Sequence, residues 1–181
     1  MKKIVLGIMM CVSALSAKAQ VITSKTINNV YEEVAYNTKS DFAYNAERTG
    51  NDITTMCVYK KNNNFNGMLT LKPHLKSEYA YADDGTLTSK VIYHWNENLN
   101  NWICAARYDY TLTYGDYSVE YSRYNQAENR FEQPEDKIVY SLMSNDNVNN
   151  VSCYHRDHQS SEYQLVSEMS VTGLPQLFAA K

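Results

Sequence analysis

The sequence lacks the short motifs that mark the common enzyme classes. It has no glycine-rich phosphate loop, no Gly-x-Ser-x-Gly elbow, and no cysteine or histidine in the context of a nucleophile. It also lacks a cluster of Lys and Arg: 20 acidic residues outnumber 17 basic ones, for a formal net charge of −3. Nucleic acids attract proteins through basic patches and counterion release, so a mildly acidic chain is a poor partner for them. We therefore expect no catalytic residue, no cofactor and no bound nucleic acid.

A long hydrophobic run is missing as well. The apolar stretch from Ile4 to Val12 is too short for a membrane-spanning helix, which needs about 20 residues. Lys2-Lys3 precedes this stretch and Ala17-Lys18-Ala19 follows it, which is the pattern of a secretory signal peptide. Residues 1–19 are thus predicted to be removed after Ala19. The mature chain, residues 20–181, is predicted to be periplasmic or secreted and to contain no transmembrane segment.

Cysteine is scarce, with four in the chain. Cys11 is a poor lipid-attachment site, because the bulky residues Ile8 to Met10 precede it where small residues would be expected. The other three, Cys57, Cys104 and Cys153, match no zinc knuckle or Cys-x-x-Cys redox site in their spacing. Three partly buried thiols, or one disulfide and one thiol, are both compatible with this number.

Alternating apolar residues predict β-strands through most of the chain. From residue 102 the even positions are apolar or aromatic over seven members, which predicts one long strand with a covered and a wet face: Trp102, Cys104, Ala106, Tyr108, Tyr110, Leu112 and Tyr114. Gly115 and Asp116 then predict a tight hairpin turn. Similar runs start at Leu87, Tyr117, Ile138 and Tyr163, and short connections between them predict antiparallel neighbours.

The predicted fold class is therefore all-β, an antiparallel meander of hairpins that forms a curved, tyrosine-rich sheet. The first third is less regular: Ile53 to Tyr59 alternates as a strand, and a short helix is expected where apolar residues recur at helical spacing, at Ile27, Val30, Tyr31 and Val34. His74, after Pro73, is interpreted as a loop residue. Because no linker interrupts residues 20–181, we expect a single domain.

An aromatic and asparagine pattern repeats after 29 positions. Trp95, Asn96, Asn100 and Trp102 are echoed by Tyr124, Asn125, Asn129 and Phe131. In each copy the first aromatic ends one predicted strand and the second begins the next, so the repeat is interpreted as a brace that closes a hairpin. Exposed aromatic rings also mark contact surfaces. Trp95, Trp102, Tyr124 and Phe131 are therefore the candidate ligand-binding residues.

Other polar clusters are better explained by turns. His155 and His158 would point to opposite faces of a strand, so no metal site is expected there. Asp83 to Gly85 and Asn145 to Asn147 resemble fragments of calcium loops but lack the further oxygen ligands. A glycosidase pair among Glu132, Glu135 and Asp136 would need two carboxylates held across a cleft, whereas these acids surround Pro134 in a predicted connection.

One stretch of sequence resembles a known family. The segments YAYADDGTLTSK at 79–90, VIYHWNENLNNW at 91–102 and YDYTLTY at 108–114 resemble the DUF3836 family of small secreted proteins from gut Bacteroidetes. The resemblance implies a signal peptide followed by a tyrosine-rich β-meander, and it brings no activity with it. The segment from Tyr81 to Leu87 is also similar to one unit of the YD repeats of large exported proteins, with Ala82 and Thr86 departing from that pattern.

These features predict an exported, non-catalytic binding or interaction module. Its partner would be an unidentified protein or glycan at the cell envelope. The alternatives are a structural protein that assembles at the envelope through its sheet edges and a small glycan-acting hydrolase.

Overall fold

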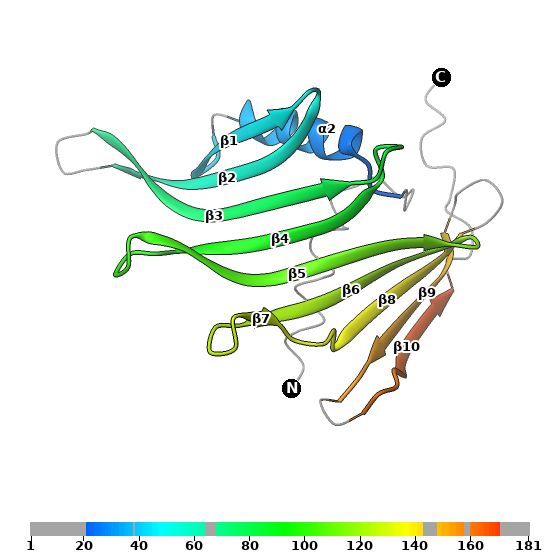
Figure 1. Ribbon diagram of the computed structural model, residues 1–181. Helices are drawn as coiled ribbons and strands as arrows, with labels where there is room; N and C mark the ends of the chain where they lie inside the picture. The colour runs from blue at the N-terminus through cyan, green and yellow to red at the C-terminus, as the bar shows by residue number, and fades with distance from the viewer. Residues whose placement is uncertain (1–20, 38, 64–67, 143–147, 158–159, 171–181) are drawn as a thin grey trace, which may run out of the picture. The chain divides into compact units, whose positions relative to one another are not determined.

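The computed structural model describes residues 21–37, 39–63, 68–142, 148–157 and 160–170. This part of the chain forms one α-helix and ten β-strands (Figure 1), namely α2 (Ser24–Ala35), β1 (Phe42–Thr49), β2 (Asp52–Asn63), β3 (Leu69–Tyr81), β4 (Leu87–Asn96), β5 (Asn101–Thr113), β6 (Asp116–Asn125), β7 (Arg130–Phe131), β8 (Asp136–Leu142), β9 (Val148–His155) and β10 (Gln164–Ser170). The predicted signal peptide, residues 1–19, lies outside the described residues.

The strands follow one another in the sheet almost as they do in the sequence. Their order is β1-β2-β3-β4-β5-β6-β8-β9-β10, and β7 pairs with β6 beside this path. Consecutive strands pair antiparallel from β1 to β5, and β9 pairs antiparallel with both β8 and β10. The predicted antiparallel meander and the short helix are confirmed.

The chain divides into two compact units. Among the described residues, the N-terminal unit lies within Ile22–Tyr110 and Glu120–Glu135, and the C-terminal unit comprises Thr111–Val119 and the described residues between 136 and 170. Strands β5 and β6 contribute residues to both units. The interpretation of residues 20–181 as one domain stays a prediction.

Helix α2 is stabilised by a capped N-terminus and by partial burial of its apolar side. Thr23 caps the N-terminus, with its Oγ1 accepting from the backbone N–H of Thr26 at 3.3 Å, and the Thr26 hydroxyl accepts in return from the backbone N–H of Thr23. The four apolar residues predicted for this helix are partly buried, namely Ile27, Val30, Tyr31 and Val34, while Glu32 and Glu33 are exposed. The helix packs against β1 and β2 within the N-terminal unit.

A bulge in β5 overturns the prediction that one face carries the whole aromatic run. Cys104 pairs with Tyr93, but Ala106 pairs with Ile92, so Ala105 is an extra residue in the ladder. Neighbouring residues of β4 point to opposite faces, and their partners in β5 do the same. Trp102 and Cys104 therefore lie on one face, while Ala106 and Tyr108 lie on the other. The end of the run differs too: Leu112 is exposed, and Tyr114 lies in the turn with φ 50°.

Register defines two faces in the N-terminal unit. One row of cross-strand partners is Met56, Ser77, Ile92 and Ala106, and three of its four members are buried. We call this the helix face, because Arg48 lies on it and places its guanidinium over the ring of Tyr31 in α2, 5.8 Å from the centroid. The opposite face carries the row Cys57, Lys76, Tyr93 and Cys104. We call it the ring face.

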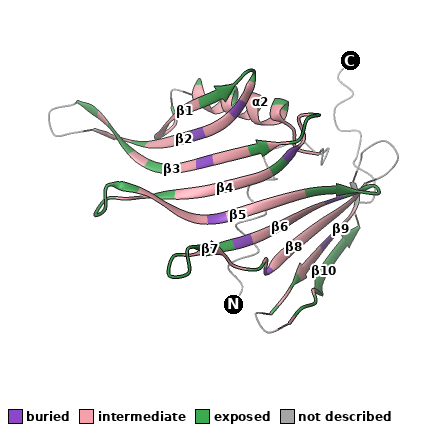
Figure 2. Ribbon diagram, in the orientation of Figure 1, coloured by how far each residue is buried: buried purple, intermediate pink, exposed green. Residues whose placement is uncertain are grey.

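The core of this fold is thin. Among the described residues the buried apolar side chains are Ile53, Met56, Leu87, Ala106 and Tyr117, and Figure 2 shows buried positions as isolated segments within strands that are mostly half-buried. Ile53 is fully buried beneath the helix, and its carbonyl accepts from the Tyr81 hydroxyl at 2.7 Å. In the C-terminal unit, Tyr117 packs against Tyr140 with 6.3 Å between ring centroids.

Two features of the N-terminal unit differ from the sequence-based interpretation. Strand β1 was not predicted, since its sequence FAYNAERT alternates weakly. His74 does not lie in a loop but in β3, where its ring stacks on Phe42 with centroids 5.5 Å apart. Pro73 is accommodated in the strand because the ladder between β2 and β3 is shifted at that point, where Tyr59 pairs with Pro73 and Val58 with Leu75.

Candidate functional site

The two copies of the 29-residue repeat form the same turn. The side-chain oxygen of Asn96 accepts from the backbone N–H groups of residues 98 and 99, both at 3.0 Å. Asn125 makes the equivalent bonds to residues 127 and 128, both at 3.1 Å. The last loop residues, Asn100 and Asn129, have φ of 49° and 53°, a left-handed conformation that asparagine tolerates better than most residues.

Each turn is closed by one aromatic pair. Trp95 lies opposite Trp102, with ring centroids 5.1 Å apart and planes at 72°. Tyr124 lies opposite Phe131, with 5.0 Å between centroids and planes at 74°. Edge-to-face packing of this kind adds about 0.5–1.5 kcal/mol beyond the buried area. The interpretation of the repeat as a hairpin brace is confirmed, and all four rings remain partly exposed.

Both aromatic pairs lie on the ring face. Trp95 is two residues from Tyr93 on β4, so both side chains point to the same side, and Trp102 shares that side as the partner of Trp95. Arg107, the partner of Val91, is on this face as well, and its guanidinium lies 4.6 Å from the ring centroid of Phe131. The sequence analysis selected these four aromatic residues because of their repeated spacing. The fold places all four on one face of the N-terminal unit.

A compact polar network lies beside these rings. The Lys76 ammonium donates to Glu78 Oε1 at 2.7 Å, and the Tyr93 hydroxyl donates to Glu78 Oε2 at the same distance. Lys76 Nζ also lies 4.1 Å from the centroid of the Tyr93 ring. Burial opposes ionisation of Glu78, but the bonds from Lys76 and Tyr93 outweigh it and hold the pKa of Glu78 below its usual value. Burial, and then the bond to Glu78, raise the pKa of Tyr93.

A second charged pair adjoins the Tyr124–Phe131 brace. Arg107 Nε donates to Asp109 Oδ2 at 2.7 Å. The Gln126 side chain, in the second turn, donates to the Cys104 carbonyl at 2.6 Å and so fixes this turn against β5. Sequence reasoning missed both charged pairs. Their signal was the spacing of opposite charges by two residues, as in Lys76-x-Glu78 and Arg107-x-Asp109, because residues two apart on a strand share a face.

The cysteines of the described chain are free thiols. Cys57 and Cys104 are on the same face but three strand spacings apart, which is about 14 Å and far beyond disulfide reach. Burial raises the pKa of both thiols. A raised pKa disfavours the nucleophilic thiolate, so neither cysteine has the environment of an activated nucleophile.

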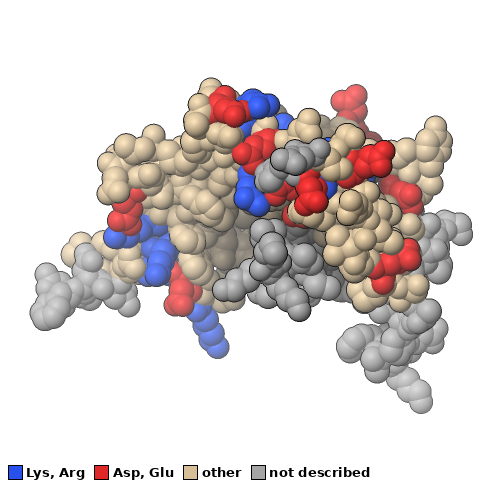
Figure 3. Space-filling view, turned by 90° about the horizontal axis from the view of Figure 1, so that it is seen from below, with Lys and Arg blue, Asp and Glu red and all other residues tan. Residues whose placement is uncertain are grey.

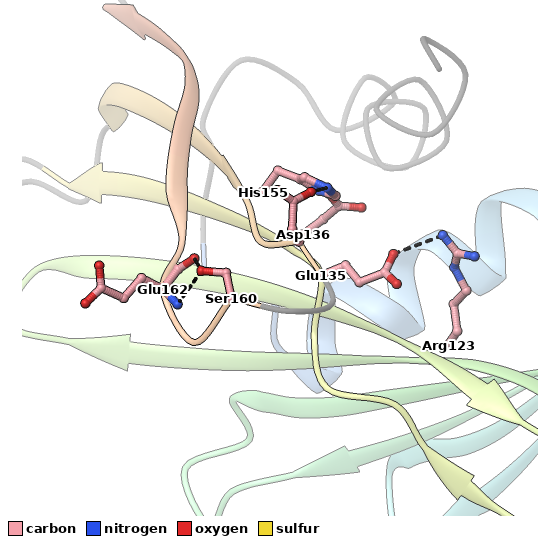
Figure 4. A network of polar contacts seen from close by, with 7 residues as sticks. Arg123, Glu135, Asp136, His155, Ser160 and Glu162 are labelled. Carbon is pink, nitrogen blue, oxygen red and sulfur yellow. Dashed lines mark hydrogen bonds and ion pairs between the residues drawn. The ribbon is translucent and has the colours of Figure 1, made fainter. Parts of the chain in front are cut away.

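The other sequence candidates have local partners. Figure 4 shows Glu135 joined to Arg123, at 2.9 Å, and Asp136 joined to His155, at 2.8 Å. Glu132 accepts from the Asn125 amide at 3.2 Å. These three carboxylates are thus engaged in ion pairs or hydrogen bonds of their own.

The predicted turn at Asp83 to Gly85 is held by local contacts. Asp84 Oδ1 accepts from the backbone N–H of Thr86 at 2.9 Å, which lowers the pKa of Asp84, and Gly85 adopts a φ of 82°. No group of three metal-ligating side chains occurs among the described residues. His158 and the segment Asn145 to Asn147 lie outside those residues. In the same described ranges, no helix has the length and apolar character to cross a membrane.

The chain is similar to proteins whose functions are also unknown. The model of a family of unknown function, DUF3836, matches residues 1–144. A protein of unknown function from Bacteroides fragilis is 24% identical, with a TM-score of 0.65 over 75% of this chain and 96% of that chain. DUF3836 proteins from Bacteroides vulgatus and Parabacteroides distasonis are 22% and 16% identical, cover 51% and 56% of this chain and 89% and 90% of theirs, and have TM-scores of 0.46 and 0.48. No curated protein matches. The Bacteroides fragilis structure shows a shared fold.

The positive φ of Asn100 predicts how substitutions in the hairpin brace change the stability of the protein. Replacing Asn100 by Ala should destabilise the protein by about 1 kcal/mol, because alanine is strained in the left-handed region, whereas Asn100→Gly should be close to neutral. The same pair of changes at Asn129 should give the same ranking. Urea denaturation of the four variants would measure it, and an alanine variant as stable as the glycine variant would contradict the proposed role of these turns.

The lowered pKa of Glu78 predicts that the free energy of unfolding depends on pH. Ionised Glu78 contributes stability that is fully present above its unfolded pKa, near 4.5, and that is lost as the pH falls through the lower folded value. Glu78→Gln should therefore be less stable than the native protein at pH 7, by a small amount because the side chain is 40% exposed, and the difference should shrink at pH 3. Urea midpoints at both pH values, with Glu33→Gln in α2 as the control, would measure this. A difference that is independent of pH would refute it.

Proposed function

We propose that this chain, which belongs to the DUF3836 family, is an exported, non-catalytic binding module whose contact surface is the ring face. The observation that supports the proposal most is the grouping of Trp95, Trp102, Tyr124 and Phe131, all partly exposed, on one face of one unit. The only described helix packs against the opposite face. The partner would be a glycan or a protein at the cell envelope.

The chemistry of the ring face supports binding rather than catalysis. An acid–base mechanism needs carboxylates with displaced pKa values beside a reacting bond. On this face Glu78 has a lowered pKa and is committed to Lys76 and Tyr93, while Asp109 is committed to Arg107. Aromatic rings held by turns, in contrast, lose little freedom when a partner contacts them, which favours recognition.

The sequence of the N-terminus supports export. The basic pair at Lys2-Lys3, the apolar stretch and the Ala-x-Ala site have the order of a signal peptide. Cleavage would leave Gln20 as the first residue. Mass spectrometry of the exported protein should find this N-terminus, and an uncleaved chain retained in the cytoplasm would contradict it.

Substitution of one ring on each face would test the binding role. Trp102→Leu should weaken binding of a captured glycan or envelope protein by about tenfold, because it removes an anchor ring from the contact surface. Tyr108→Leu is the matched control: it is in the same strand, it breaks a comparable ring pair with Tyr121, at 5.2 Å between centroids, and it lies on the helix face. Screening would use immobilised polysaccharides and envelope fractions, with thermal unfolding to confirm that both variants fold. Equal losses in the two variants would contradict the proposal.

A second candidate function is assembly through a sheet edge. Strand β10 ends the strand order, all of its residues are exposed, and they include the large apolar side chains Leu165, Val166 and Met169. Exposed edges of this kind pair with other chains unless they are blocked. Light scattering at high protein concentration should then show oligomers that Val166→Lys disrupts. A strict monomer would eliminate this candidate and leave the ring-face proposal unaffected.

A further inference from the structure

The charged side chains nearest the rings on the ring face are paired with one another. Lys76 is matched by Glu78, and Arg107 by Asp109, each with one hydrogen bond of 2.7 Å. Two of these groups have a further local contact, since Tyr93 donates to Glu78 and Arg107 lies over Phe131. Figure 3, a view from below, shows basic and acidic side chains beside one another in some places and further acidic side chains without a visible basic neighbour in others.

This balance disfavours a charged ligand. An anion or cation on the ring face would have to separate an existing ion pair, or lose its own hydration without a new partner, and both cost free energy. A neutral ligand avoids the two costs. The pairs then act as fixed polar groups that orient a ligand, and the binding contacts fall to the rings.

The composition of the ring face also disfavours a protein partner. The centre of a protein interface is depleted in Lys, Glu and Asp and rich in continuous apolar surface. Here Lys76 lies in the row next to Trp95–Trp102 and Glu78 in the row beyond it, so polar groups interrupt the apolar surface. A sugar chain has the matching pattern, because each sugar presents an apolar C–H face bordered by hydroxyl groups.

The two aromatic pairs are spaced for an extended ligand. Trp95–Trp102 bridges β4 and β5, Tyr124–Phe131 bridges β6 and β7, and β5 is the neighbour of β6. The midpoints of the two pairs are therefore two strand spacings apart across the sheet, about 10 Å. One sugar ring cannot cover both pairs, whereas a short chain of sugars can.

Hydrogen-bond donors for such a ligand are present at the first pair. The indole N–H groups of Trp95 and Trp102 have no acceptor among the side chains and backbone groups that the structure describes. Each is carried by a partly exposed ring whose position the turn fixes. Indole N–H groups donate readily to hydroxyl oxygens, so they are suited to the edge of a sugar that stacks on the neighbouring ring.

We propose, resting on the binding role of the ring face, that its ligand is a neutral oligosaccharide that lies across both aromatic pairs. Sugar rings stack on Trp95–Trp102 and on Tyr124–Phe131, and hydroxyl groups between them accept from the indole N–H groups. The charged pairs Lys76–Glu78 and Arg107–Asp109 keep their contacts with each other when the ligand binds.

Calorimetric titration of the purified protein with neutral oligosaccharides of increasing length, from one sugar to six, would test this proposal. The probes would be β-glucan, xylan and mannan series, with polygalacturonate as the acidic comparison. Affinity for at least one neutral series should rise by about tenfold or more between one sugar and the length that spans both pairs. It should change little between low and high salt, because no ion pair forms. Trp102→Leu and Phe131→Leu should each remove the gain with length, and the control Tyr108→Leu should keep it.

The outcomes separate this inference from the binding role itself. Binding of polygalacturonate with a steep salt dependence, or of a protein alone, would overturn the oligosaccharide inference while leaving the ring face as the binding surface, provided that Trp102→Leu abolishes it. Equal affinity for one sugar and for six would overturn the two-pair arrangement. Failure of every neutral series to bind would overturn the inference. Neutral binding that survives both ring substitutions would overturn the inference and the binding role together.

Discussion

Cross-strand pairing is the constraint on which this structure depends. With so few apolar side chains fully buried in the described residues, the hydrophobic core alone contributes less than in a domain with two packed layers. Further stability comes from interactions between neighbouring strands, namely backbone hydrogen-bond ladders, edge-to-face ring pairs and charged pairs that share a face. Tyrosine suits this arrangement, because its ring covers a strand neighbour while its hydroxyl stays near a polar group, as Tyr81 and Tyr93 show.

The parts of the fold that local chemistry determines were predictable from the sequence. The spacing of Asn96 and Asn100 between two aromatics specifies a turn and its closing pair without reference to the rest of the chain, and the second copy behaves alike. The helix was predictable for the same reason, since its cap and its apolar side are contained in one segment. The alternation in β2, β4 and β5 likewise indicated strands correctly.

The parts that depend on register were not predictable. A bulge such as the one at Ala105 depends on how two strands fit together, and no turn-forming residue marks its position in the sequence. The prediction of a single covered face in β5 was wrong for that reason, and so was the placement of His74 in a loop, since Pro73 is tolerated only where the ladder shifts. The candidate rings were found, but their common face and the charged pairs beside them emerged only from the pairing of four strands.

The bulge at Ala105 makes the chemistry of the sheet sensitive to strand pairing at a single point. If β5 kept its length but paired without the bulge, strict alternation from Cys104 would place Ala106 and Tyr108 on the ring face and Arg107 and Asp109 on the helix face. The one extra residue at Ala105 is thus what places the charged side chain of Arg107 beside Phe131. Within such a meander, shifts of pairing inside strands provide a route to new surfaces as direct as substitution of the side chains themselves.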